Sequence, residues 1–117
     1  MFPDVQARLE DYGVDVPDEG TVTLYHAGPL EKLDVIERTL IIPATTDDDG
    51  RHRVYVASSS AIAEVIPHAE GAVAVEVDVK LPLEMSLGDS PDKPWAELVY
   101  DVPDADVGMP VVSARRV

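Results

Sequence analysis

The clearest hydrophobic pattern in the chain is a strict alternation over residues 73–80. Every second residue is a valine, and the positions between the valines carry Ala74, Glu76, Asp78 and Lys80. A period of two places all the valines on one face of an extended chain. The pattern therefore predicts a strand with one face on the core and the other at least partly in water.

Two stretches have helical spacing. Residues 3–12 predict a short helix, because their apolar side chains share one stripe, a proline is tolerated in the first turn, and Gly13 offers a C-terminal stop. Any serine of Ser58–Ser60 is a suitable N-cap for a second helix over residues 61–66, which the following proline would end. Residues 30–42 fit a helical stripe only loosely and are left open.

Runs rich in β-branched and aromatic residues predict four further strands: 21–26, 53–57, 95–102 and 110–117. Turn-forming and polar residues predict the connections: 14–20, 44–52, 82–94 and 103–109. Residues 1–20 would thus form an N-terminal helix and loop. The order of helix, strand, open segment, strand, helix and three strands predicts one compact α+β domain over residues 1–117.

The composition narrows the possible functions. The chain has 23 acidic and 9 basic residues, a formal net charge of -14, and no cysteine. Disulfides, thiolate metal sites and cysteine nucleophiles are therefore excluded, and the usual charge-driven binding of nucleic acid or anionic membranes is disfavoured. Such acidity is typical of a protein hydrated at high salt; the alternative is an inhibitor that mimics DNA. The single acidic run, Asp47–Asp49 before Gly50, predicts a solvated turn.

We find no targeting signal and no metal-binding motif in the sequence. No apolar run is long enough to span a membrane, and the N-terminus has no signal-peptide pattern, so a cytoplasmic protein is expected. The three histidines, His26, His52 and His68, do not form a pair at metal-ligand spacing, and no metal site is predicted. Hydrolase elbows, phosphate-binding glycine loops and dinucleotide fingerprints do not occur. The oligomeric state has no sequence signal.

Three residues stand out by their positions. His26 ends a predicted strand and precedes Ala27 and Gly28, where the backbone can turn sharply and expose two amide groups. Tyr55 lies in the next strand, just before the serine-rich helix start. Glu97 begins an otherwise apolar strand. Each residue alone also has an ordinary structural explanation.

Together these residues carry a family resemblance. The segments TVTLYHAG, RVYVASSSAIAEVI and PWAELVYDVP, in this order, resemble the ADP-ribosyltransferase fold. The similarity is closest to the His-Tyr-Glu group, typified by diphtheria toxin and the poly(ADP-ribose) polymerases, and to its small bacterial and phage-type members. It covers residues 21–117 and implies a split sheet of short strands with a few short helices.

The resemblance implies NAD as the substrate and cleavage of the bond between nicotinamide and ribose. It implies that His26 binds the ribose hydroxyls and that the backbone of Ala27, beside Gly28, holds the nicotinamide amide. Tyr55 would stack on the nicotinamide ring. A hydroxyl from Ser58, or from one of the two serines after it, would bind the amide oxygen.

The resemblance further implies that Glu97 accepts the ribose 2′-hydroxyl and stabilises the positive charge of the transition state. Two departures from the family pattern matter. Ala27 stands where the family commonly has glycine, and Trp95 replaces the first glutamate of the Glu-x-Glu pair of arginine-modifying members. Modification of protein arginine is therefore disfavoured. A protein or a small molecule is a better acceptor than nucleic acid, unless the arginine pairs 51/53 or 115/116 offset the negative charge. The alternative is a non-catalytic domain of the same fold that acts as an inhibitor or adaptor through its acidic surface.

Overall fold

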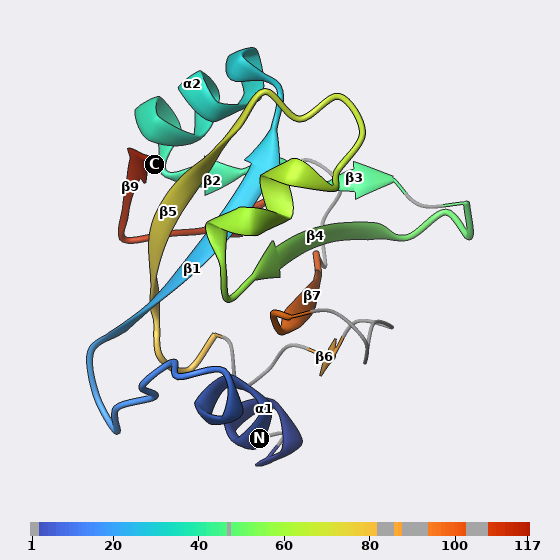
Figure 1. Cartoon of the computed structure of the whole chain (residues 1–117). Coiled ribbons are helices and arrows are strands. Elements are labelled where there is room, and N and C mark those ends of the chain that lie inside the picture. Colours follow the sequence, from blue (N-terminus) through green and yellow to red (C-terminus); the bar gives the residue numbers. More distant parts are fainter. Residues whose placement is uncertain (1–2, 47, 82–85, 88–93, 103–107) are drawn as a thin grey trace.

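A computed structural model describes residues 3–46, 48–81, 86–87, 94–102 and 108–117 (Figure 1). Within these residues, two α-helices, α1 (Pro3–Asp11) and α2 (Leu30–Thr39), and one 3₁₀ helix, η1 (Ser60–Glu64), accompany the strands. The strands are β1 (Thr21–Gly28), β2 (Ile41–Ile42), β3 (Thr45–Thr46), β4 (His52–Ala57), β5 (Gly71–Asp78), β6 (Ser86–Leu87), β7 (Glu97–Asp101), β8 (Met109–Pro110) and β9 (Ser113–Arg116). The expected α+β class is confirmed.

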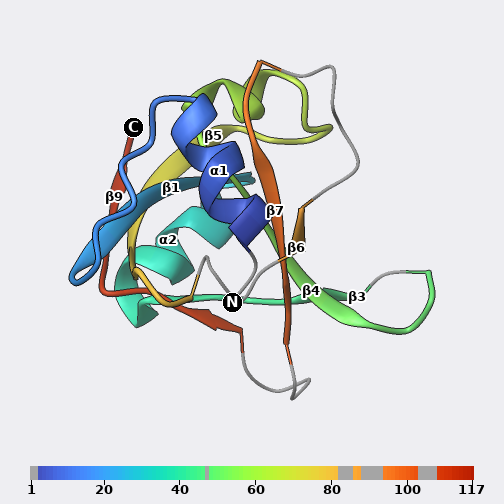
Figure 2. The same cartoon turned by 90° about the horizontal axis from the view of Figure 1, so that it is seen from below.

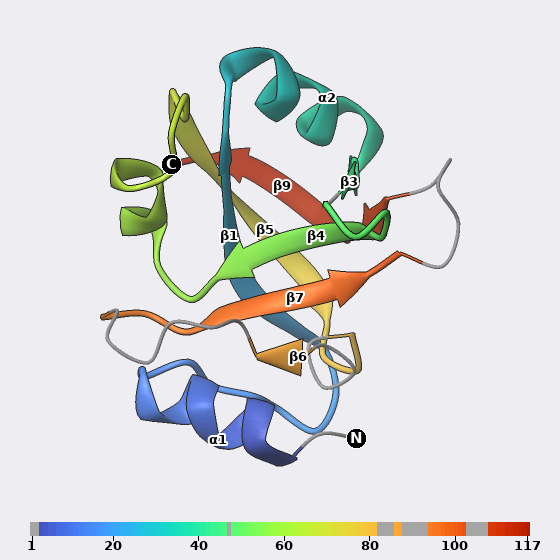
Figure 3. The same ribbon diagram turned by 90° about the vertical axis from the view of Figure 1, so that its right-hand side faces the viewer.

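The main sheet has the strand order β6-β7-β4-β1-β5-β9, with β3 beside β4, and all its described pairings are antiparallel. Strands β1 and β5 pair along their whole length, from Thr21–Asp78 to Gly28–Gly71. Strands β1 and β4, in contrast, share only the pair Tyr25–Ala57. Figure 3 shows β4 and β7 running across β1 rather than along it. The sheet therefore consists of two parts that meet at one point and diverge.

The main core lies on the face of the sheet that carries the alternating valines. Both helices bury their apolar stripes in it, through Val5 and Leu9 of α1 and Leu33 and Ile36 of α2. Seen from below in Figure 2, α1 lies between β7 and β9 with α2 behind it. The buried sheet residues of this core include Val22, Leu24, Val54, Val56, Val73, Val75, Val77 and Leu98. The alternation predicted for residues 73–80 is thus confirmed, since all four of its valines are buried.

The opposite face of the sheet is covered in part by η1, which lies in front of β1 and β4 in Figure 1. The side chain of Ser59 caps this helix by accepting the amide hydrogen of Ala61. A smaller apolar cluster of Ala57, Ile62 and Trp95 forms beneath it. This small cluster closes the region where β4 ends and β7 begins.

Four expectations about element bounds need correction. The first strand runs to Gly28 instead of ending at His26, because its pairing with β5 continues through Ala27; there is no sharp turn at that point. The polar connection 44–52 contains β3, which pairs with β4. The helix expected over 61–66 is a short 3₁₀ helix of which only Ile62 is buried. The last strand, expected over 110–117, divides into β8, which pairs with β2, and β9, which pairs with β5.

The structure describes the open segment and parts of the predicted connections. The open segment 30–42 forms α2 followed by β2. The turn-rich segment 82–94 contains β6, and its residues 82–85 and 88–93 lie outside the described residues, as do 103–107 of the last connection. In the acidic run the turn is described at residues 48–50, where Gly50 has a φ of 81°, and Asp47 lies outside the description.

Replacing Gly108 with alanine is expected to destabilise the protein by about 1–3 kcal/mol, the usual cost of overpacking. A Cβ at this position would lie 1.9 Å from the carbonyl oxygen of Ile42, so β8 would have to move away from β2. Urea denaturation measures the loss. Gly71→Ala is the control, because a Cβ there meets only Leu33 Cδ1 at 3.4 Å. Equal midpoints for the two variants would contradict the prediction.

Candidate functional site

A cavity of about 390 Å³ opens beside the point where β1 and β4 part. If their pairing continued beyond Tyr25–Ala57, Ala27 would lie opposite Tyr55; instead both residues line the cavity. Its volume is within the ~300–1,000 Å³ range of small-molecule sites. The lining residues are His26, Ala27, Gly28, Pro29, Lys32, Thr45, Tyr55, Ile62, Ile66, Pro67 and Glu97. The cavity thus brings together the three residues singled out from the sequence, which lie on β1, β4 and β7.

His26 bridges the gap between the two parts of the sheet. Its ring nitrogen Nδ1 lies 2.7 Å from the backbone carbonyl oxygen of Tyr55. Because a carbonyl oxygen only accepts hydrogen bonds, Nδ1 is the donor and carries the proton. The other ring nitrogen, Nε2, is buried and has no hydrogen-bond partner among the described residues. In the neutral ring, Nε2 is therefore an unused acceptor on a residue that lines the cavity.

The surroundings of His26 keep this ring neutral. Burial, reinforced by the nearby positive charge of Lys32, lowers the pKa of His26 from 6.5 to about 4, and the hydrogen bond to Tyr55 opposes this only in part. A buried acceptor without a donor costs about 1–3 kcal/mol. A ligand hydroxyl that donates to Nε2 would remove that cost.

Tyr55 and Glu97 approach the cavity from the same face of the sheet. Ala57 pairs with Glu97, and Tyr55 is two residues before Ala57, so the strand alternation puts all three side chains on one face. The backbone just before Glu97 is fixed by Ser58: its amide donates to the carbonyl of Ala96 at 2.9 Å, and its hydroxyl accepts the Ala96 amide hydrogen at 2.9 Å. Glu97 is thus held on a strand end that is tied at both polar groups of the preceding residue.

Ser58 itself is not part of the cavity wall. It lines a separate, open cavity of about 760 Å³, together with Tyr12 and Tyr25. Ser59 caps η1, and Ser60 begins it. The structure thus gives Ser58 a positioning contact next to Glu97, whereas the resemblance implied direct contact with the nicotinamide amide.

Sequence reasoning missed two polar residues of the cavity, Lys32 and Thr45. Lys32 lies in the first turn of α2, and helix side chains point back toward the N-terminus, which here is the end of β1. A helix beginning directly after the His26 strand would have been the signal for it. Thr45 belongs to β3, a strand of two residues that has no detectable period.

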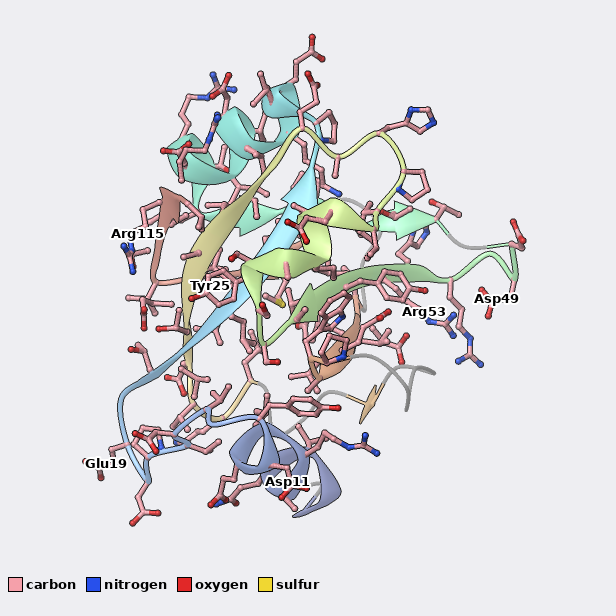
Figure 4. All side chains as sticks on the ribbon, viewed as in Figure 1. Asp11, Glu19, Tyr25, Asp49, Arg53 and Arg115 are labelled. Carbon is pink, nitrogen blue, oxygen red and sulfur yellow. The ribbon has the colours of Figure 1, made fainter. Side chains whose placement is uncertain are left out.

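The arginine pairs considered as positive patches are largely engaged with carboxylates. Arg53 pairs with Asp49 at 3.3 Å and with Asp101 at 3.0 Å, and Figure 4 shows Arg53 and Asp49 near each other at the outer end of β4. Arg116 pairs with Asp34 and Glu37 of α2. Three of the four arginines considered thus pair with carboxylates, which reduces the positive charge available to attract a polyanion.

Comparisons with family models, curated proteins and solved structures give no match. Within the described residues, no group of three or more histidine, aspartate and glutamate side chains is arranged to hold a metal ion. None of the helices in the described ranges has the length and apolar character that a membrane crossing requires. The function is therefore inferred from the cavity itself.

Proposed function

We propose that this chain is an ADP-ribosyltransferase that cleaves NAD between nicotinamide and ribose and transfers ADP-ribose to an acceptor. One observation carries the proposal: His26, Tyr55 and Glu97, dispersed over 72 sequence positions, line a single cavity. A sheet split between β1 and β4 is also what the family resemblance implies. The acceptor is a protein group or a small molecule rather than nucleic acid, since the net charge is -14.

The chemistry needs few groups. The bond from C1′ of the ribose to the nicotinamide nitrogen breaks, and its electron pair leaves with nicotinamide, while positive charge develops on the ribose. The negative charge of Glu97 stabilises that cation, and the bare Nε2 of His26 accepts a ribose hydroxyl. The acceptor then attacks C1′ and loses its proton, and Glu97, a carboxylate among the lining residues, is the proposed base for that proton.

The direct test is release of nicotinamide from NAD by the purified protein, followed by chromatography at low and high salt. Salt is varied because strong surface repulsion in an acidic protein is screened only at high ionic strength. Release above the background of NAD alone supports the proposal. Tight NAD binding without release would instead support the non-catalytic domain, and the absence of both would overturn the proposal.

Tyr55 provides a test of ligand orientation. If its ring stacks on nicotinamide, Tyr55→Ala should raise the dissociation constant for NAD by about 2- to 10-fold, the value of an aromatic contact, whereas Tyr55→Phe should keep most of the affinity. Isothermal titration calorimetry measures both variants. Tyr100→Phe is the control, because Tyr100 packs against the main core and does not line the cavity. An unchanged affinity in Tyr55→Ala would exclude stacking.

A further inference from the structure

Lys32 is the one lysine or arginine among the described residues that line the cavity. Its aliphatic stem covers Gly28: a Cβ added to Gly28 would lie 3.4 Å from Lys32 Cδ and 3.9 Å from its Cβ. The residue is half-buried, and burial lowers the pKa of its ammonium. The packed stem restricts where the ammonium can lie, and Lys32 is among the residues that line the cavity.

The ammonium of Lys32 forms no ion pair or side-chain hydrogen bond with any described residue. Among the described residues, Arg51, Arg53 and Arg116 pair with carboxylates, whereas Lys32 does not, and Lys32 differs from these arginines in lining this cavity. A partly buried charge without a partner is unfavourable, and an anion bound in the cavity would offset that cost.

The neighbouring groups indicate which anion. His26, whose buried Nε2 has no partner among the described residues, lines the cavity together with Tyr55 and Glu97. The acceptor nitrogen of His26 can bind a ligand hydroxyl, the ring of Tyr55 can stack on an aromatic ring, and the carboxylate of Glu97 can attract a positive charge.

We propose that Lys32 binds the diphosphate of the dinucleotide and thereby makes the site selective for phosphorylated nicotinamide nucleotides over nicotinamide riboside. This inference rests on the proposed function. Lys32 reaches the cavity from α2 and Glu97 from β7, so the two opposite charges come from different elements. A ligand with a cationic ring joined through ribose to an anionic diphosphate has the matching charges.

The test compares Lys32→Met and Lys32→Arg with the matched control Lys80→Met, which removes the same charge from an exposed position away from the cavity. Lys32→Met should raise the dissociation constant and KM for NAD about 10-fold, the typical loss of a charge-assisted hydrogen bond, with kcat nearly unchanged. Its affinity for nicotinamide riboside should equal that of the wild type. Lys32→Arg should recover most of the NAD affinity, and Lys80→Met should match the wild type throughout.

Measurements with inorganic pyrophosphate and ADP-ribose distinguish a failure of the role of Lys32 from a failure of the proposed activity. If NAD is cleaved and Lys32→Met keeps the wild-type KM and the wild-type inhibition by pyrophosphate, the role of Lys32 is overturned while the activity stands. If nicotinamide is never released but pyrophosphate and ADP-ribose bind in a Lys32-dependent way, the phosphate site stands and the proposed activity fails. Equal weakening of NAD and nicotinamide riboside in Lys32→Met would also overturn the role.

Discussion

Replacing Glu97 with glutamine is expected to lower the rate of nicotinamide release about 100- to 1,000-fold, the usual effect of removing one preorganised electrostatic group. Glutamine has the same shape and keeps an oxygen that can accept the ribose 2′-hydroxyl. It lacks the negative charge that opposes the cation formed in the transition state. The loss should therefore fall on kcat, with the affinity for NAD changed much less.

Glu64→Gln is the matched control, because Glu64 lies on η1 near the cavity but is exposed and does not line it. Thermal unfolding of both variants checks that the strand start at Glu97 is intact. Rates from single-turnover reactions with NAD separate binding from chemistry. A Glu97→Gln variant with wild-type kcat would show that this carboxylate has no part in bond cleavage.

The features that the sequence revealed are those set by neighbouring residues. The alternation over residues 73–80 gave the β5 strand and the identity of its buried face. The proline at position 3 and Gly13 gave the limits of α1 almost to the residue. His26, Tyr55 and Glu97 were found because each stands at or near a strand end, which is a local property, and the three dispersed motifs have an order similar to that of a known fold.

The features that could not be predicted from the sequence depend on contacts between distant residues. Strands β2, β3, β6 and β8 have two residues each, too few for any period to be seen. The end of α2 at Leu40 has a φ of 58°, a conformation usually signalled by glycine, so its C-terminus carried no ordinary signal. The double contact between Ser58 and Ala96 joins residues 38 positions apart.

The cavity itself depends on such a distant relation. It exists because β1 leaves β4 after the pair Tyr25–Ala57 while its pairing with β5 continues to Gly28. A local sequence pattern does not show where a strand stops pairing with its neighbour on one side while it continues to pair with its neighbour on the other side. The place of Lys32 in the cavity lining could not be predicted for the same reason, because it depends on how α2 packs beside the end of β1.

Between pH 6.5 and pH 4, the neutral state of His26 should cost the folded protein about 3 kcal/mol of stability, at ~1.4 kcal/mol for each pKa unit. The pKa of His26 is lowered in the fold, so the unfolded chain binds a proton through this range while the folded chain does not. Falling pH therefore favours unfolding; the contribution is intact above pH 6.5 and fully lost near pH 4. Urea denaturation at several pH values measures the slope.

The decisive comparison is with His26→Asn, whose amide can still donate to the carbonyl of Tyr55 but cannot take up a proton. Lys32 and Glu97, the charged residues of the same cavity, are present in both proteins, so their effects largely cancel in the difference. The variant should lose about 3 kcal/mol less than the wild type on acidification. His68→Asn is the control, because His68 is exposed and has a φ of 66° that asparagine tolerates. Parallel curves for wild type and His26→Asn would contradict the buried neutral ring, and with it the unpartnered Nε2 acceptor on which the proposed ribose binding depends.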